Sequence, residues 1–140
     1  MTRNDVDKKI FATCLNCMDG RVQLPTIHWI KENYNVDYVD MITEIGMVGA
    51  LSADYFEIDS IIKKVRFSVE QHNSSNIFVV GHHDCKGNPI DDETHKKQIY
   101  RATKRLNRLD LPCKVTGLWL SDEWRIERII EYKKRYWRIK

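Results

Sequence analysis

Residues Phe11–Val22 read FATCLNCMDGRV, an apolar stretch that runs into a polar turn containing glycine. The apolar part belongs to Lys9–Cys14 (KIFATC), which is short and apolar and therefore predicts a buried strand. The polar part carries a cysteine, an aspartate and an arginine spaced C-x-D-x-R, which are Cys17, Asp19 and Arg21. One cysteine thus falls inside the predicted strand, and a second lies beside an acid and a base just beyond it.

Three later segments also predict strands, because each is a short run rich in apolar or β-branched residues. They are Val36–Ile42, Ile77–Val80 and Cys113–Leu120. The segment Thr43–Ala50 (TEIGMVGA) contains two glycines and predicts an irregular loop. The segment Ser121–Tyr132 (SDEWRIERIIEY) fits either a turn followed by an antiparallel strand or a capped helix, since its apolar residues do not settle the period.

Helices are predicted between these strands from capping residues and from apolar residues at helical spacing. The first begins near Pro25. The second is capped by Ser52 and buries an apolar stripe, which consists of Tyr55, Ile58, Ile62, Val65 and Val69. The third opens at Pro89 with a run of acids and stops before Pro112.

Strands that alternate with helices predict an α/β fold with a mostly parallel sheet flanked by helices on both faces. In such sheets the loops at the carboxyl ends of the strands line a crevice where the strand order reverses. Both cysteine-containing motifs follow predicted strands, CMDGR after the first and GHHDC after Ile77–Val80. The two motifs therefore meet if those two strands are neighbours.

The length of 140 residues predicts one domain, residues 1–140. No apolar run approaches the ~20 residues of a membrane span, and the first residues lack the apolar core of a signal peptide, so a cytoplasmic protein without a membrane partner is expected. The net charge of +3 is too small to indicate nucleic acid. Most of the excess lies in the tail EYKKRYWRIK, where basic and aromatic residues alternate, a pattern more typical of a solvated or subunit-packing end.

The second motif places His82 and Cys85 at the spacing H-x-x-C, which a tight turn at a strand end can aim at one point. Adding Cys17 gives two thiolates and one imidazole, a donor set that suits zinc. Three protein ligands leave a fourth position for water or substrate, as in catalytic zinc sites.

Cys14 is the alternative fourth ligand, since Cys14, Cys17, His82 and Cys85 together spell C-x-x-C and H-x-x-C. If residues 11–17 are extended, Cys14 and Cys17 lie about 10 Å apart on opposite faces of the strand. Two sulfurs that share a zinc must lie within roughly 5 Å of each other. Cys14 is therefore expected to be a small core residue, unless the chain turns sharply at Leu15.

The C-x-x-C spacing also occurs in thiol oxidoreductases, where the motif opens a helix that stabilises the thiolate. Here an acid follows Cys17, and the next helix is predicted to begin only near Pro25. This interpretation is therefore disfavoured.

Asp19 and Arg21 permit three arrangements. The Asp19 carboxylate can occupy the fourth position on the metal, or it can pair with Arg21 and leave that position to water. In the third arrangement Asp19 only caps the following helix and Arg21 lies on the surface. The spacing alone does not choose among them.

With both motifs in this order, the chain resembles the beta-class carbonic anhydrase family, as a small and divergent member. The resemblance rests on Cys17–Arg21 (C-x-D-x-R) and His82–Cys85 (H-x-x-C), and it extends over most of the chain. The chain departs from the family pattern in two places. Thr43–Gly46 replaces an Arg-Asn-Ala-Gly stretch, and Lys86 separates the second cysteine from its glycine.

The resemblance implies zinc held by Cys17, His82 and Cys85, with Asp19 and Arg21 as a gating pair and Asp19 as a further potential ligand. It implies reversible hydration of carbon dioxide to bicarbonate by a zinc-bound hydroxide, and a homodimer or higher homo-oligomer. It also favours the strand at the end of the chain over the helix. Two alternatives stay open: a zinc hydrolase of carbonyl sulfide or carbon disulfide, and a non-catalytic zinc-binding module.

Overall fold

The computed structural model describes residues 8–54 and 56–134, which are built around a five-stranded sheet in the order β2-β1-β3-β4-β5. The strands are β1 (Phe11–Cys17), β2 (Tyr38–Glu44), β3 (Asn76–His82), β4 (Lys114–Leu120) and β5 (Ile126–Tyr132). β1 to β4 run in parallel, and β5 pairs antiparallel with β4. The predicted mostly parallel sheet is confirmed, as is the closing antiparallel strand.

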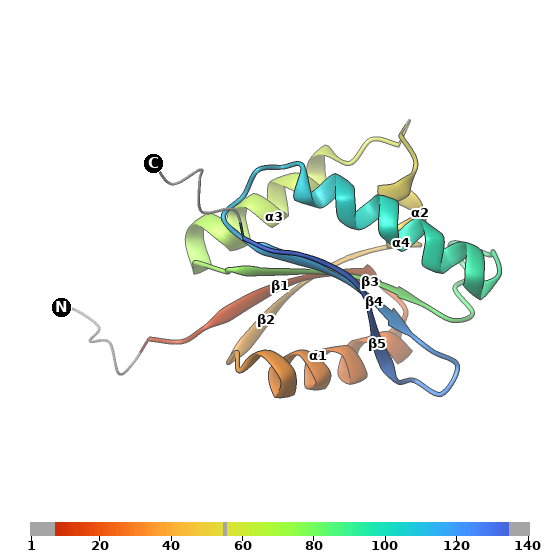
Figure 1. The fold of residues 1–140 in the computed structure, drawn as a ribbon, viewed down its shortest axis with the longest axis horizontal. Helices are drawn as coiled ribbons and strands as arrows, with labels where there is room; N and C mark the ends of the chain where they lie inside the picture. The colour runs from red at the N-terminus through yellow and green to blue at the C-terminus, as the bar shows by residue number, and fades with distance from the viewer. Residues whose placement is uncertain (1–7, 55, 135–140) are drawn as a thin grey trace.

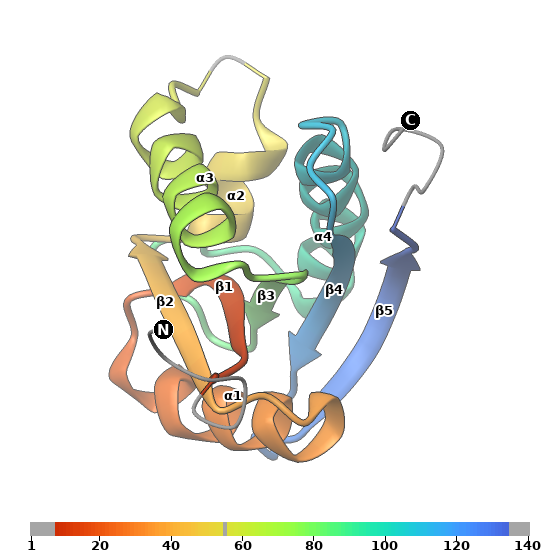
Figure 2. The same ribbon diagram turned by 90° about the vertical axis from the view of Figure 1, so that its left-hand side faces the viewer.

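Helices cover both faces of this sheet, as expected for parallel strands joined by crossovers. They are α1 (Gly20–Tyr34), α2 (Met47–Ser52), α3 (Asp59–His72) and α4 (Asp92–Asn107). α1 lies alone on one face, and α2, α3 and α4 lie on the other (Figures 1 and 2). The fold therefore has three layers, with the sheet in the middle.

Each face of the sheet contributes to its own apolar cluster, because successive strand residues point to opposite sides. Cys14 and Phe78 belong to the cluster beneath α1. Leu15 and Val79 belong to the larger cluster beneath the other three helices. All four side chains are fully buried, which is why β1 and β3 read as continuous apolar runs in the sequence.

The strand order reverses next to β1. From β1 the chain crosses to β2 on one side, and it later returns to place β3 on the other side. β1 and β3 pair from Thr13–Ile77 to Leu15–Val79, and both continue beyond this pairing to Cys17 and His82. The two motifs therefore emerge side by side at the switch point, as expected if their strands are neighbours.

The start of α1 was predicted wrongly. The helix begins at Gly20 rather than near Pro25, which lies inside it. The reason is local: the Asp19 carboxylate accepts a hydrogen bond from the backbone N–H of Arg21 at 2.9 Å and caps the helix. The C-x-D-x-R motif is therefore both the end of a strand and the start of a helix.

The segment after β2 also differs from the prediction. Ser52 does not cap a long helix; it is the last residue of α2, and its hydroxyl donates to the carbonyl of Gly49 at 3.2 Å. Ala53 is extended and separates α2 from α3, which begins only at Asp59. Part of the predicted loop Thr43–Ala50 is thus strand and helix, and the predicted stripe residue Tyr55 lies outside the described residues.

The glycine that precedes α2 has a structural requirement. Gly46 has a φ of 58°, a conformation that side chains disfavour. A Cβ at this position would also lie 2.4 Å from the backbone oxygen of Gly87. The loop after β2 and the loop after the second motif therefore pack backbone against backbone.

Two further expectations from the sequence concern membrane spans and the basic tail. Within residues 8–54 and 56–134, no helix is long and apolar enough to cross a bilayer. Most of the basic and aromatic tail, residues 135–140, lies outside the described residues.

Candidate metal centre

Three side chains converge at the switch point. Cys17 ends β1, His82 ends β3, and Cys85 follows in the turn after β3. Their donor atoms all lie within 4.8 Å of one another, and all three residues are buried. The structure thus brings together the three residues that the sequence selected as metal ligands.

The distance between the two sulfurs fits a shared metal ion. The Sγ atoms of Cys17 and Cys85 lie 3.8 Å apart. Two zinc–sulfur bonds of ~2.3 Å at a tetrahedral angle separate the sulfurs by about 3.8 Å. A tetrahedral ion could therefore be accommodated between them without moving the sulfurs apart.

The imidazole of His82 is oriented as a metal ligand would be. Its Nδ1 donates to the carbonyl of His83 at 2.8 Å, which leaves Nε2 as the acceptor nitrogen. Nε2 is buried and has no hydrogen-bond partner among the described residues. Burial lowers the pKa of His82, so the ring is neutral, the form that binds metals. A buried lone pair without a partner is costly, and a metal ion would satisfy it.

The thiol of Cys85 resists ionisation in this environment. Burial raises the pKa of Cys85 to about 11, and the neighbouring Cys17 contributes to the same effect. Two thiolates in one buried site would repel each other unless a cation compensated their charge. A divalent ion reverses this balance, because coordination deprotonates thiols.

The turn between His82 and Cys85 depends on Asp84. This residue has a φ of 57°, in the left-handed region that aspartate tolerates better than most residues. The turn places the Cys85 sulfur within 4.8 Å of the donor atoms of His82 and Cys17. The backbone N–H of His83 donates to the carbonyl of Leu120 at 3.0 Å and holds the turn to β4.

Arg21 joins the two motifs. Its guanidinium donates to Asp19 from Nη2 at 2.7 Å and from Nε at 3.1 Å, a bidentate pair. Nη2 also donates to the carbonyl of Asp84 at 3.0 Å, and Nη1 to its carboxylate at 3.3 Å. The guanidinium lies over the ring of Trp124, 4.9 Å from the centroid. One side chain thus ties the loop after β1 to the loop after β3.

Asp19 combines two of the three arrangements that its sequence allows. It caps α1, and it pairs with Arg21. Its hydrogen bonds with Arg21 lower its pKa to about 2, so the carboxylate is ionised at all ordinary pH values. It is not part of the Cys17, His82 and Cys85 cluster.

Cys14 lies on the opposite face of β1 from Cys17. It is fully buried in the cluster beneath α1, and burial strongly raises its pKa. Both residues are free thiols and both belong to one straight strand, so they neither form a disulfide nor open a helix. The expected core position of Cys14 agrees with this geometry.

Sequence reasoning missed two residues that support the first motif. Gln23 donates both amide hydrogens, to the carbonyl of Cys17 at 2.8 Å and to that of Asp19 at 2.9 Å. Its own oxygen accepts from the fully buried amide of Asn16 at 3.0 Å. This clamp, Asn16 and Gln23, fixes the backbone on both sides of Met18. Nothing in the sequence around these two residues predicts the clamp, because one lies inside a strand and the other inside a helix.

A buried histidine packs beside the end of β3. His95, on α4, is only 3% exposed, and its ring lies edge-on to Trp119 at 5.1 Å between centroids. It contacts β3 where Gly81 leaves room, since a Cβ there would lie 2.9 Å from the His95 Nε2. The pKa of His95 is lowered to about 4, mainly by burial and to a smaller extent by the charge of the neighbouring His82.

Two other histidines, His83 and His28, are candidates for carrying a proton from the site, because each lies near one of the two motifs in the chain. The Nδ1 of His83 lies 3.0 Å from both carboxylate oxygens of Asp92. His28 is exposed on α1. Neither belongs to the cluster of donor atoms, and of the two only His83 adjoins a proposed ligand in the chain.

Solved structures that share this fold include beta-carbonic anhydrases. One match is to two tetrameric beta-carbonic anhydrases from the filamentous ascomycete Sordaria macrospora, with a TM-score of 0.62 and 13% identity, covering 89% of this chain and 84% of the other. A second is to the beta-carbonic anhydrase CafA of Aspergillus fumigatus, with a TM-score of 0.52 and 17% identity, covering 88% and 76%. At these identities the likeness establishes the shared fold.

The family follows from the sequence match. Residues 7–130 match the model of the family described as "Putative carbonic anhydrase", and the chain belongs to this family. A comparison with curated protein sequences finds no match. The resemblance read from the two motifs is therefore confirmed at the level of family and fold.

The clamp predicts a loss of stability on Gln23→Leu. The change removes two donors and leaves the carbonyls of Cys17 and Asp19 without these partners, which should lower the free energy of unfolding by about 1–3 kcal/mol. Urea unfolding of the reduced, metal-free protein measures this change in the free energy of unfolding. Gln71→Leu, at an exposed position of α3, is the matched control and should change the value by less than about 0.5 kcal/mol. Equal effects of the two changes would refute the clamp.

His95 predicts an acid-sensitive contribution to stability. Its folded pKa of about 4 lies below the ordinary 6.5, so between these values the unfolded chain binds a proton that the folded chain excludes. The contribution is complete above pH 6.5 and is lost as the pH falls toward 4, by roughly 3 kcal/mol in total at ~1.36 kcal/mol per pKa unit. His95→Gln does not titrate, so its free energy of unfolding, measured without metal at pH 7 and pH 4.5, should depend less on pH. Parallel pH profiles for the two proteins would contradict this origin.

Proposed function

We propose that this protein is a zinc-dependent carbonic anhydrase that catalyses the reversible hydration of carbon dioxide to bicarbonate. The proposed zinc ligands are Cys17, His82 and Cys85. The observation that carries the proposal is the convergence of the unpartnered His82 Nε2 with two sulfurs 3.8 Å apart. Membership of the family and the shared fold support the reaction class.

The donor set supports zinc over the hard divalent cations. Two sulfurs and one imidazole suit zinc, whereas magnesium and calcium prefer oxygen ligands. When bound, zinc supplies Lewis acidity that lowers the pKa of a water, and with two thiolate donors this pKa should stay above the ~7 reached with three neutral imidazoles. The hydrogen bond from His82 Nδ1 to His83 fixes the ring orientation that metal binding requires.

In this proposal Asp19 and Arg21 orient the reacting groups. Asp19 is ionised, and two guanidinium bonds and one backbone N–H hold its carboxylate in place two residues beyond Cys17. An ionised carboxylate can accept a hydrogen bond from a group in the fourth position and so fix its orientation. Arg21 neutralises the charge of Asp19 and prevents a surplus of negative charge beside two thiolates.

We include a homodimer or a larger homo-oligomer in the proposal. The Sordaria macrospora enzymes are described as tetrameric. Met18 and Ile45 follow the paired strand residues Cys17 and Glu44, and they expose 60% and 62% of their surface. Large apolar side chains exposed together are typical of interaction surfaces.

The proposed ligand set predicts which substitutions abolish metal binding. Cys17→Ser, His82→Ala and Cys85→Ser should each reduce zinc from one per chain to a small fraction, because each removes one of three donors. Cys14→Ser is the matched control and should retain full zinc, since Cys14 faces the other side of β1. Elemental analysis of protein purified under reducing conditions measures the zinc content per chain. Loss of zinc in Cys14→Ser, or no zinc in the unmodified protein, would overturn the ligand assignment.

The proposed reaction predicts activity that rises with pH. Stopped-flow hydration of carbon dioxide by the zinc-loaded protein should accelerate from pH 7 to pH 9, because the acid group at the metal is expected to titrate above ~7. Asp19→Asn should lower kcat/KM by roughly 10-fold or more while zinc is retained. Glu70→Gln, an exposed change on α3, is the control and should leave the rate unaltered.

The same preparation distinguishes the alternatives. Hydrolysis of carbonyl sulfide or carbon disulfide without hydration of carbon dioxide would assign the sulfur substrates. Retained zinc without either activity would identify a non-catalytic module. A pH–rate profile that is flat from neutral pH upward would contradict the proposed origin of the activity.

A further inference from the structure

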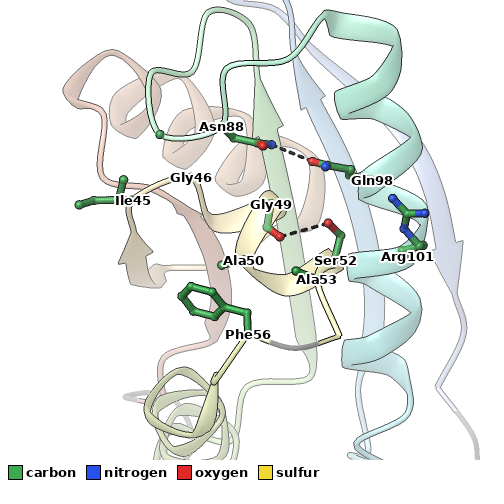
Figure 3. A pocket seen from close by; sticks show the side chains of 11 residues that line it. Ile45, Gly46, Gly49, Ala50, Ser52, Ala53, Phe56, Asn88, Gln98 and Arg101 are labelled. Atoms are coloured by element: carbon green, nitrogen blue, oxygen red, sulfur yellow. Dashed lines mark hydrogen bonds between the residues drawn. The ribbon is translucent and has the colours of Figure 1, made fainter.

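Two adjoining concavities lie between the α2 segment and α4, and none of the proposed zinc ligands lines either of them. The first has a volume of about 390 Å³, and the second a volume of about 320 Å³. They share Ser52 and Arg101 and therefore adjoin at these residues, and the two together are named the groove. Figure 3 shows the first concavity, with Gln98 and Arg101 on α4 facing Ser52 and Ala53 across it.

The second concavity is strongly basic. Its charged lining residues are Asp54, Arg101, Lys104, Arg105 and Arg108. The four cations fall on one side of α4 and its C-cap, at helical spacings of three and four residues. Among the described residues, none of these cations has a carboxylate within ion-pair distance, so Asp54 compensates little of their charge.

One of the cations is held in place by the backbone. Nη1 of Arg105 donates to the carbonyls of Leu51 and Ala53 at 3.0 and 3.2 Å. These carbonyls lie at the end of α2, so Arg105 satisfies the acceptors that would otherwise repel an anion there. The groove therefore has a fixed wall on the side opposite α4.

The helix dipole of α4 explains the position of only some of these cations. Basic residues in a last turn interact favourably with the helix dipole, which accounts for Lys104 and Arg105. Like charges at spacings of three and four residues destabilise a helix, however, and here they also share one concavity. A bound anion would offset this repulsion.

We propose that this basic groove binds a small anion that carries two or more phosphate groups. From Arg101 to Arg108 the helix rises by about 10 Å, which is longer than one phosphate and comparable to a chain of two or three. Guanidinium groups bind phosphate oxygens in bidentate pairs, and Lys104 adds a mobile point charge. The amide pair formed by Asn88 and Gln98, 2.7 Å apart, lines the first concavity beside these charges. The proposal is independent of zinc and of the reaction proposed above.

The test is calorimetric titration of the full chain with tripolyphosphate, pyrophosphate and orthophosphate at constant ionic strength. Tripolyphosphate should bind at one site per chain and more tightly than orthophosphate. The double variant Arg101→Gln and Arg108→Gln should weaken binding roughly tenfold or more for each cation removed. It leaves Arg105 in place, so the contacts of α4 with α2 persist.

The matched control removes the same charge elsewhere. Lys63→Gln and Arg66→Gln change exposed positions of α3 and should leave the affinity within about twofold, since neither residue lines the groove and the lost charges are screened by salt. Lys104→Gln is a single exposed change in the groove and supplies a second test if the double variant does not fold.

Three outcomes would overturn the proposal. The first is the absence of saturable binding of tripolyphosphate. The second is an equal loss of affinity in the α3 control, which would indicate attraction by net charge alone. The third is a single-stranded oligonucleotide that binds more tightly than tripolyphosphate and loses affinity in the same groove variants, which would make nucleic acid the ligand. Because zinc content is measured separately, failure here leaves the proposed carbonic anhydrase untouched.

Discussion

The parallel pairing of β1 with β3 is the constraint on which the candidate site depends. It places the end of one strand, Cys17, beside the end of the other, His82, although 64 residues lie between them in the chain. Apolar packing fixes the register, because Cys14 and Leu15 are fully buried on opposite faces of β1. A slip of one residue would exchange these faces and turn Cys17 toward α1. The core beneath the helices therefore determines the geometry of the proposed metal ligands.

Charge explains why a cation would suit the cluster of Cys17, His82 and Cys85. Two thiols and an imidazole are buried together, and burial disfavours both the ionised thiolate of Cys85 and the protonated imidazole of His82. The cation that joins the two motifs, Arg21, is already engaged with Asp19 and Asp84, so it does not compensate two thiolates. A divalent ion with two thiolates and a neutral imidazole is formally neutral. The cluster is thus best satisfied by an ion with two positive charges.

Much of this arrangement could be predicted from the sequence, because its signals are local. Apolar runs gave the parallel strands, and the spacings C-x-D-x-R and H-x-x-C selected the residues that converge. The division between α2 and α3 could not be predicted, since Ser52 is a good cap by composition. It depends on packing: α2 buries Met47, Val48 and Leu51 in the core, and Ala53 is extended. The Asn16 and Gln23 clamp and the contact of Arg21 with Trp124 were missed for the same reason, because they join elements that only the fold brings together.

The start of α1 shows how one residue serves the fold and the site together. Asp19 accepts the backbone N–H of Arg21, which begins the helix, and the same carboxylate accepts two guanidinium bonds. To become a fourth metal ligand, Asp19 would have to give up the cap, the bidentate pair, or both. Arg21 would then lose its main partner while its bonds to Asp84 still tied it to the second motif. Closing the proposed metal site with Asp19 would therefore oppose the interactions that start α1 and join the two motifs, which supports the proposal that the fourth position is left to a small molecule.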